Sequence, residues 1–541
     1  MTSPEPAART VRDAAFDVLR ERGLTAVFAN PGSTEIALLG GLPDDFQFVL
    51  GLHEGALVGM ASGFAIGRGE PAFVLLHTTA GLGNAVSALA TARVNRAPLV
   101  VLVGQQDRRH LAQEPFLAGR LHGLAGEYPV WVEQPARAQD VPGALARAWH
   151  EARTARGPAI VIVPMDDWLA PAGERHEIPA PRRLLDARAA DPAAVAELAD
   201  LVEQADSPAL VVGAGADDPD TWAALVALAE RLRSPVWQES FGARAGFPQD
   251  HPQFAGYLPA GRRRLRETLA GHDFVLAVGA PVFRQYPYEE GPLVEEGTRV
   301  AVVTDDPAEA HRSPVELALL AAPAAVCAEL ARLVPERSGP VPTPMARPAA
   351  PAPPGPGESL RAGHVLAALA ERLPPETVLV EEAPSARPEL HARLPARQPL
   401  GFLSAAMGGL GFGLSAPVGV RMALPERPVV AVVGDGASLY TIQALWSAAR
   451  YEAGVIFVVL ANGGYAVMDR LAEAQNQAAP WPGFGGIDIA AMARAQGCDA
   501  RRIETHDELE AALDEALDGI DERRQPLLLE VVVAPEQTFE A

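Results

Sequence analysis

The sequence has 541 residues, of which 48% are hydrophobic and 21% charged, and its formal net charge at pH 7 is −23. The length predicts three or four domains, and the composition is typical of a soluble globular protein. The negative charge argues against nucleic acid and anionic membranes as partners. Two distant cysteines, a polar N-terminus and the lack of an apolar run of about 20 residues predict a reduced, cytoplasmic protein without a membrane span.

The first domain is predicted at residues 1–180, where amphipathic stretches alternate with short apolar runs as in a doubly wound α/β fold. Its helices are predicted at Val11–Arg22, Glu54–Gly67 and Asn84–Arg93. Its strands are predicted at Ala26–Ala29, Phe46–Leu50, Ala72–His77, Leu99–Gly104 and Ala159–Pro164. Short apolar runs of this kind are typical of buried parallel strands.

A second α/β domain is predicted at residues 181–338. Its strands are predicted at Ala209–Gly213, Pro235–Gln238, Phe274–Gly279 and Val300–Thr304. The turn Gly213-Ala214-Gly215 is similar to a dinucleotide-binding turn, but a third glycine and a ribose-binding acid are missing at the required offsets. We therefore predict no nucleotide site in this domain.

Residues 339–358 form a linker rich in proline and alanine, which can contribute neither to a sheet nor to a core. The third domain is predicted at residues 359–541, with an element order similar to that of the first but no recognisable sequence repeat. Its strands are predicted at Val378–Val380, Val429–Val433, Val455–Leu460 and Leu527–Val533. The expected fold is thus three doubly wound parallel-sheet domains of the α/β class.

Three polar residues of the first domain lie where predicted strands end or helices begin. Glu54 is flanked by apolar and small residues, which indicates a partly dehydrated carboxyl that can hold a proton against a heterocycle nitrogen; the alternative is a simple helix cap. His77 ends a strand at the edge where ligands bind, or it is a structural histidine. Ser33 follows the first strand and also has the spacing of an ordinary helix cap.

The segment Val429–Gly464 predicts a βαβ unit, because two apolar runs end in Gly-Asp-Gly and Asn-Gly-Gly with a helical pattern between them. Both strand ends open on one edge of the sheet, so the Asp435 carboxylate and the Asn462 amide are expected side by side. Backbone N–H groups at the helix start face the same space. Magnesium diphosphate requires such hard oxygen ligands next to a phosphate-binding helix start, although Gly-Asp-Gly alone is more often a simple turn.

Eight segments spread over the chain resemble the thiamine-diphosphate (ThDP)-dependent 2-oxo acid decarboxylase family, in particular its benzoylformate-decarboxylating members. They are FANPGSTE, GLHEGALVGMASGFA, LLHTTAGLGNAVSAL, PLVVLVGQQ, VIVPMDDW, GHDFVLAVGAPVFR, GGLGFGLSAPVGV and VVGDGASLYTIQALW. The resemblance implies a pyrimidine-binding first domain, a central domain and a diphosphate-binding third domain. It also implies a cofactor site between the first domain of one subunit and the third of another, hence a homodimer as the minimum unit and usually a homotetramer.

The resemblance also implies cofactor contacts for individual residues. Glu54 matches the glutamate that hydrogen-bonds the aminopyrimidine ring of ThDP. Asp435 and Asn462 match the side-chain ligands of Mg²⁺, and Gly464 matches the backbone ligand. Leu410 matches the apolar residue that holds the cofactor in its bent shape. The other implied cofactor contacts are Ser385, Gly408, Gly434, Gly436, Ala437, Ser438 and Tyr465.

Substrate contacts are implied for Ser33 and His77, which match residues that hold the substrate carboxylate and transfer protons. The chain departs from the family pattern at Tyr286, where these decarboxylases have a second active-site histidine. A tyrosine can donate a hydrogen bond but is a poor proton shuttle at neutral pH. Val467 and Met468, which should line the acyl pocket, also differ from the family pattern.

The leading functional hypothesis is ThDP- and Mg²⁺-dependent, non-oxidative decarboxylation of an aromatic or bulky 2-oxo acid to an aldehyde and CO₂. A carboligase or acyloin lyase with the same cofactor, acting on aldehydes, is the alternative that Tyr286 suggests. A third hypothesis is a catalytically idle paralogue, in which Ala461, Pro384 and Tyr286 would mark decay. Oxidative members of the family carry a flavin in the middle domain, which we do not expect here.

Overall fold

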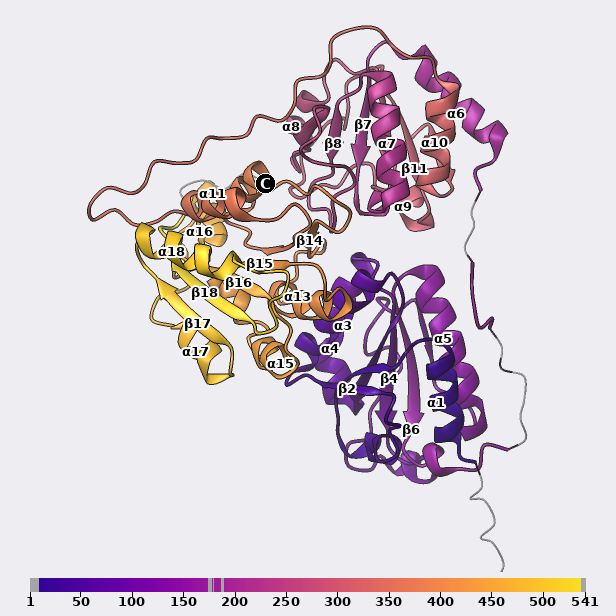
Figure 1. The fold of residues 1–541 in the computed structure, drawn as a ribbon. Helices are drawn as coiled ribbons and strands as arrows, with labels where there is room; N and C mark the ends of the chain where they lie inside the picture. Colours follow the sequence, from indigo (N-terminus) through magenta and orange to yellow (C-terminus); the bar gives the residue numbers. More distant parts are fainter. Residues whose placement is uncertain (1–8, 174–177, 179, 186–188, 537–541) are drawn as a thin grey trace, which may run out of the picture.

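The structure is a computed structural model that describes residues 9–173, 178, 180–185 and 189–536. The polar N-terminal residues 1–8, where we expect no signal segment, lie outside these ranges. The described chain forms three α/β units, each built on a six-stranded sheet of parallel strands. Figure 1 shows the N-terminal unit in indigo and purple, the central unit mainly in magenta and the C-terminal unit in orange and yellow. The predicted fold class is confirmed.

The N-terminal sheet has the strand order β2-β1-β3-β4-β6-β5. Its strands are β1 (Ala26–Asn30), β2 (Gln47–Leu50), β3 (Ala72–His77), β4 (Leu99–Gln105), β5 (Trp131–Glu133) and β6 (Pro158–Pro164). Its α-helices are α1 (Val11–Glu21), α2 (Ile36–Leu39), α3 (Glu54–Arg68), α4 (Thr78–Val94) and α5 (Val141–Ala155). The prediction that α4 begins only at Asn84 is wrong, because Gly81 and Leu82 are buried and packing outweighs the low helix propensity of glycine.

The central sheet has the order β12-β11-β10-β7-β8-β9. Its strands are β7 (Pro208–Val212), β8 (Val236–Gln238), β9 (Phe254–Tyr257), β10 (Phe274–Val278), β11 (Arg299–Thr304) and β12 (Leu317–Leu320). Its α-helices are α6 (Pro192–Gln204), α7 (Pro219–Leu232), α8 (Arg262–Thr268), α9 (Pro307–His311) and α10 (Pro323–Leu333). Short 3₁₀ helices in the first two units are η1 (Ser33–Glu35), η2 (Arg108–Gln113), η3 (Ala138–Asp140), η4 (Asp167–Leu169) and η5 (Ala214–Ala216).

The C-terminal sheet, β14-β13-β15-β16-β18-β17, repeats the connectivity of the N-terminal sheet. Its strands are β13 (Val378–Glu382), β14 (Phe402–Ser404), β15 (Val429–Gly434), β16 (Ile456–Ala461), β17 (Asp499–Ile503) and β18 (Leu527–Val532). Its helices are α11 (Ala362–Arg372), α12 (Arg387–Arg393), α13 (Phe412–Ala423), α14 (Asp435–Ser438), α15 (Ala444–Arg450), α16 (Ala466–Ala474), α17 (Ile489–Ala495) and α18 (His506–Leu517). The single helix predicted after Asp435 is wrong: a turn at 439–443 separates α14 from α15.

The sequence patterns miss five strands, namely β5, β9, β12, β14 and β17. Each of them is an edge strand of its sheet. Strands β5 and β14 are only three residues long, and β12 and β17 are largely exposed. The continuous apolar runs that predict strands arise where both faces of a strand of several residues are buried, which is typical of interior strands; β14 is buried but too short to form such a run.

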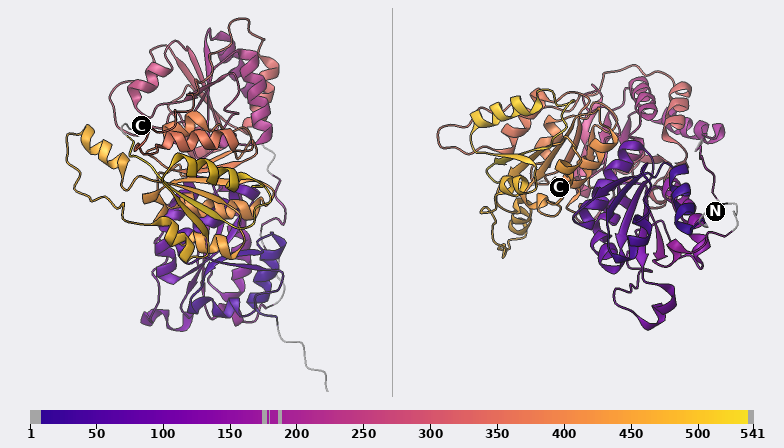
Figure 2. Two further views of the ribbon diagram at one scale, coloured as in Figure 1. Left: turned by 60° about the vertical axis from the view of Figure 1, so that its left-hand side comes forward. Right: turned by 60° about the horizontal axis from the view of Figure 1, so that its bottom comes forward.

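Helices α3 and α13 join the N-terminal and C-terminal units. The two helices approach so closely that a Cβ on Gly63 would lie 2.0 Å from the carbonyl oxygen of Ala416, and one on Gly419 would lie 1.8 Å from that of Met60. Glycine is therefore required at this crossing. One apolar core cluster runs from the first sheet through both helices into the third sheet, which fixes α3, and with it Glu54, against the C-terminal unit. Figure 2 shows this neighbourhood from two further sides.

The linker at 339–358 contains no helix or strand and crosses from the central unit to α11 in Figure 1. Its backbone is tied to the central unit where Met345 N donates to Phe254 O over 2.7 Å. Both Cys327 and Cys498 are free and buried. Among the residues that the structure describes, no helix combines the length and hydropathy required to cross a membrane.

Candidate active site

Two of the three sheets carry polar side chains at the point where their strand order reverses. In the N-terminal sheet this point lies between β1 and β3, which end at Asn30 and His77. In the C-terminal sheet it lies between β13 and β15, which end at Glu382 and Gly434. Ligands of doubly wound folds bind at the carboxyl ends of strands at such points. The chain therefore contains two half-sites of the same topological kind.

Glu54 is the centre of the N-terminal half-site. It is the first residue of α3 and is only 8% exposed. Asn30 Nδ2 donates to Glu54 Oε1 over 3.2 Å, and Asn84 Nδ2 donates to Oε2 over 3.1 Å. The capping alternative does not apply, because the side chain of His53 caps α3 by accepting from Gly55 N. Two amide donors therefore fix the orientation of the Glu54 carboxyl group.

His77 belongs to a second hydrogen-bonded cluster in the same half-site. Its Nδ1 lies 3.0 Å from Glu35 Oε2 and 3.0 Å from Thr34 Oγ1. Glu35 is buried, accepts from Gly32 N over 2.8 Å and is also hydrogen-bonded to the Thr34 hydroxyl. His77 is thus one partner of a buried glutamate. Sequence reasoning missed Glu35, although it stands in the same post-strand segment as Ser33.

Ser33 opens the short helix η1, whose N-cap is Gly32, so the helix-cap alternative does not apply to it either. The residue is exposed. Gly32 lies directly against the imidazole, since a Cβ there would be 2.3 Å from His77 Nδ1. The backbone therefore places Ser33 next to the ring of His77 at the surface of the half-site.

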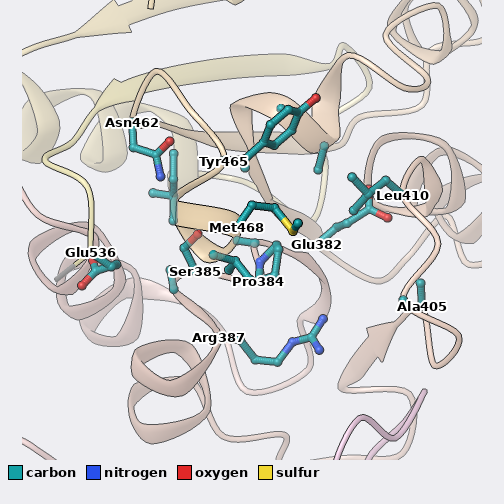
Figure 3. A pocket seen from close by; sticks show the side chains of 18 of the residues that line it. Glu382, Pro384, Ser385, Arg387, Ala405, Leu410, Asn462, Tyr465, Met468 and Glu536 are labelled. Atoms are coloured by element: carbon teal, nitrogen blue, oxygen red, sulfur yellow. The ribbon is translucent and has the colours of Figure 1, made fainter. Parts of the chain in front are cut away.

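The C-terminal half-site is a cavity of about 460 Å³. Figure 3 shows many of the side chains that line it. The cavity collects nearly all the residues predicted for the C-terminal and central domains, namely Tyr286, Ser385, Gly408, Leu410, Gly434, Asp435, Gly436, Ala437, Asn462, Gly464, Tyr465, Val467 and Met468. Ser438 does not line the cavity; it is buried, and its hydroxyl donates to the carbonyl of Asp435.

Asp435 and Asn462 follow adjacent strands and line the same end of the cavity, as predicted. The Asp435 carboxylate is buried and accepts from Gly436 N and Gly463 N, both over 2.7 Å. Burial raises the pKa of Asp435, although these N–H groups favour the ionised form. Asn462 Oδ1 accepts from Gly464 N over 3.2 Å. No cluster of three or more His, Cys, Asp or Glu occurs in the described ranges, so a cation here would bind carboxylate, amide and carbonyl oxygens, the ligands that Mg²⁺ prefers.

The turn after β15 packs tightly under an aromatic ring and lines the cavity. A Cβ on Gly436 would lie 2.6 Å from Tyr465 Cε1, so only glycine fits under this ring. Tyr465 in turn meets Phe484 edge to face at 5.0 Å. This turn places the N–H groups at the start of α14 beside Asp435 on the cavity side, and this donor set fits the diphosphate of a magnesium complex.

The cavity wall where the central and C-terminal units meet is aromatic and cationic. Tyr286 is 57% exposed and meets Phe241 edge to face at 5.9 Å, and the guanidinium of Arg387 lies 5.6 Å from the same ring. Arg387 is paired with buried Glu381 at 2.9 Å, and a second arginine of the wall, Arg284, with Glu239 at 3.1 Å. Both cations have a carboxylate partner, so this wall carries no surplus of positive charge.

The structure does not bring the two half-sites of one chain together. Ser33, Glu54 and His77 are absent from the residues that line the cavity. Exposed apolar side chains border both half-sites, with Ile36 and Leu52 on one and Met407 and Met468 on the other. Each half-site thus presents an apolar rim that nothing in this chain covers within the described residues.

Three family models of thiamine pyrophosphate (ThDP) enzymes match the chain: the N-terminal TPP binding domain at residues 9–123, the central domain at 195–330 and the C-terminal TPP binding domain at 388–531. The chain is 40% identical to the benzoylformate decarboxylase of Pseudomonas aeruginosa, over 98% of this chain and 100% of that protein. The chain belongs to the ThDP-dependent 2-oxo acid decarboxylase family. The resemblance recognised in the sequence, and ThDP as the cofactor, are thereby confirmed.

Solved structures of this decarboxylase family agree over almost the full chain. A ThDP-dependent 4-hydroxybenzoylformate decarboxylase of Rhodococcus jostii RHA1 superimposes with a TM-score of 0.91 at 36% identity. A benzoylformate decarboxylase of Polynucleobacter necessarius gives a TM-score of 0.93 at 34% identity. Both comparisons cover 98% of this chain and 100% of the other.

In the central unit, the dinucleotide-like turn is filled by the protein itself. Gly215 N donates to Gly279 O over 2.8 Å, and a Cβ on Gly215 would lie 2.8 Å from the Cα of Gly279. Ala214 N donates to the Glu239 carboxylate over 3.4 Å. This decarboxylase-family chain therefore uses its central switch point for packing contacts.

Proposed function

We propose that the protein is a non-oxidative decarboxylase that uses ThDP and Mg²⁺ to convert an aromatic or bulky 2-oxo acid into an aldehyde and CO₂. The observation that carries the proposal is the presence of two complementary half-sites in one chain. One holds a buried carboxyl, Glu54, between two amide donors, and the other holds Asp435 and Asn462 at the end of a cavity with a largely apolar wall.

Residues of the C-terminal half-site would bind the diphosphate end of the cofactor, and Glu54 would bind its aminopyrimidine end. Asp435, Asn462 and the carbonyl of Gly464 would bind Mg²⁺, and N–H groups at the start of α14, including Ala437, would bind the diphosphate. Glu54 would hold a proton at the aminopyrimidine ring, and Leu410 and Gly408 would support the ring system. When bound, ThDP supplies the carbon nucleophile and the electron sink for the loss of CO₂.

The substrate would meet the Ser33–His77 side of the N-terminal half-site. The Ser33 hydroxyl can donate to the 2-oxo acid carboxylate, and His77 can move a proton through the nitrogen that Glu35 leaves free. Val467, Met468 and the aromatic wall around Tyr286 would receive the bulky acyl group. The relatives named for benzoylformate and 4-hydroxybenzoylformate support an aryl substituent.

The active unit is proposed to be a homodimer at least, assembled as a homotetramer, in which the N-terminal half-site of one subunit faces the C-terminal cavity of another. The separation of the half-sites in one chain and their uncovered apolar rims support this arrangement. Contact between the rims would remove the exposed apolar surface from water and close the site.

A panel of 2-oxo acids tests the proposal. Benzoylformate, 4-hydroxybenzoylformate and branched or short aliphatic 2-oxo acids are incubated with the protein, and CO₂ and aldehyde are measured with and without ThDP and Mg²⁺. Release of both products that depends on cofactor and metal, with aryl acids preferred, is expected. No turnover of any member of the panel would reject the proposal.

A carboligase is the second candidate, and Tyr286 is the observation that favours it. A wall tyrosine cannot shuttle protons at neutral pH as readily as a histidine, which would slow aldehyde release and favour capture of a second aldehyde. Mixing two aldehydes and measuring 2-hydroxy ketones separates the candidates, because a strict decarboxylase forms little of that product.

A further inference from the structure

Glu382 is a buried carboxyl of the cavity to which the proposed mechanism gives no role. It is the last residue of β13, is 3% exposed, and lines the cavity together with Gly408 and Leu410. Figure 3 shows its side chain next to Leu410. In the described part of the chain, no ion pair joins Glu382 to a cation. An unpaired buried carboxyl is unfavourable unless hydrogen bonds hold it.

The carboxyl group of Glu382 is bound by three consecutive backbone N–H groups. Gly411 N donates to both of its oxygens, over 3.0 and 3.1 Å, and Phe412 N and Gly413 N each donate over 3.1 Å. These amides open α13 and have no acceptor within the helix. Glu382 therefore fixes the start of α13 at the residue that directly follows Leu410.

A helix start does not require a glutamate of this kind. Burial raises the pKa of Glu382 to about 8, although the three N–H groups favour its ionised form. A serine or threonine at the N-cap would satisfy one or two of the amides without burying a carboxyl. The Glu382 side chain, in contrast, connects the end of β13 with the start of α13 across the switch point.

The same turn is held from its other side. The carbonyl of Gly411 accepts from Ser415 Oγ over 2.6 Å and from Thr441 Oγ1 over 2.9 Å. Gly408 and Gly411 have φ values of +73° and +107°, which other residues rarely adopt. A turn built on two such glycines has many alternative conformations, so the contacts of its neighbours decide its shape.

We propose that Glu382 is a positioning residue for the cofactor, which locks the turn Gly408–Gly411 so that the Leu410 side chain and the Gly408 carbonyl face the thiamine ring system. The inference rests on the cofactor contacts proposed for Gly408 and Leu410. The carboxyl touches neither the substrate nor the reacting atoms in this assignment. It acts through three amides of the backbone.

Equilibrium dialysis of ThDP in the presence of Mg²⁺ tests the inference without any substrate. Glu382→Ala should weaken ThDP affinity about 10- to 100-fold, the range known for loss of the partners that orient metal ligands. Sodium formate should restore part of the affinity of this variant, because formate offers a carboxylate to the three free amides. Glu382→Gln should also weaken ThDP binding. Its melting temperature without ThDP at pH 8.5 should nevertheless be no lower than that of the wild type, because the substitution removes a buried charge.

Two further variants keep the test decisive. Thr441→Val removes the hydroxyl on the opposite side of Gly411 and should weaken ThDP binding a few-fold. Glu309→Gln changes a buried glutamate of the central unit that accepts from Thr304 Oγ1, and it should leave ThDP affinity unchanged and insensitive to formate.

Wild-type ThDP affinity in both Glu382 variants would overturn the inference. The inference would also be overturned if formate did not restore ThDP affinity and both Glu382 variants melted below the wild type without ThDP. Glu382 would then be a structural residue only. A failed 2-oxo acid panel, in contrast, would reject the proposed reaction and leave the dialysis result standing.

Discussion

His77 Nδ1 and Glu35 Oε2 lie 3.0 Å apart at the carboxyl end of the N-terminal sheet. The carboxylate is buried and is itself fixed by Gly32 N over 2.8 Å. A carboxylate at Nδ1 favours the tautomer with the proton on that nitrogen and leaves Nε2 to exchange protons with a substrate. The pair therefore gives the proposed proton-transfer residue a fixed ring and a defined tautomer.

Glu35→Gln should lower kcat for a 2-oxo acid about 100-fold while ThDP affinity stays within twofold of the wild type. The amide no longer offers a carboxylate to Nδ1 of His77, so the ring and its tautomer are held less firmly, and Glu35 lies outside the cofactor cavity. Steady-state kinetics and dialysis measure the two effects. Glu371→Gln, on the exposed face of α11, is the matched control and should behave as wild type. An unchanged kcat in Glu35→Gln would show that the pair only stabilises the fold.

Glu54→Gln should lower kcat about 10³-fold without a loss of melting temperature. The amide keeps the size of the side chain and its place between Asn30 and Asn84, but it cannot carry the proton that the proposed mechanism assigns to it. His53→Ala removes the cap of α3 and should show the opposite pattern, a lower melting temperature with most of the activity retained. A mild effect of Glu54→Gln on turnover would argue against its proposed role.

The interior of each sheet could be predicted from sequence because burial on both faces leaves a continuous apolar run, as at Val429–Val433. Edge strands such as β17 (Asp499–Ile503) have no such run, since one side and much of both faces meet water. The break between α14 and α15 could not be predicted from the sequence pattern either. Thr441 lies in that break and binds the carbonyl of Gly411, a contact between segments distant in sequence.

The same distinction applies to the candidate site. Asp435 and Asn462 could be found because each stands in a short motif at the end of an apolar run. Asn30, Glu35 and Glu382 were missed because their roles come from hydrogen bonds made after folding. Asn30 and Glu382 stand at or just after the end of a predicted strand, so a search of both switch points for polar residues would have identified them. Glu35 lies five residues beyond the end of β1 and has no such signal.

Removal of the metal should release the cofactor. Dialysis against EDTA is expected to strip ThDP from the wild type, and Mg²⁺ should restore both binding and turnover, because the Asp435 and Asn462 oxygens cannot hold a diphosphate without a cation. Asp435→Ala should not recover ThDP even with excess Mg²⁺. Asp499→Asn, exposed on the edge strand β17, serves as the control. Full ThDP retention after complete metal removal would contradict the proposed role of Asp435.

The stability of the ThDP-free protein should depend on pH through Glu382. Its pKa is about 8 in the folded protein and near 4.3 in an unfolded chain, so the folded state binds the proton more tightly. The contribution of Glu382 to stability is therefore full at low pH and is lost as the pH rises towards 8. The melting temperature of Glu382→Gln relative to wild type should rise between pH 5 and pH 8.5. Parallel curves for the two proteins would show that Glu382 does not titrate in this range.

Mixed oligomers test whether two chains share each active site. Glu54→Gln and Asp435→Ala disable opposite half-sites, so a hybrid dimer of the two contains one doubly altered site and one intact site. Random assembly of co-expressed subunits should then restore about one quarter of wild-type turnover, although each parent is nearly inactive. The control is a mixture of Glu54→Gln with Glu35→Gln. Both of these changes lie in the N-terminal half-site, so every site of the hybrid remains altered and no recovery is expected. Equal inactivity of both mixtures would place the complete site within one chain and refute the shared arrangement.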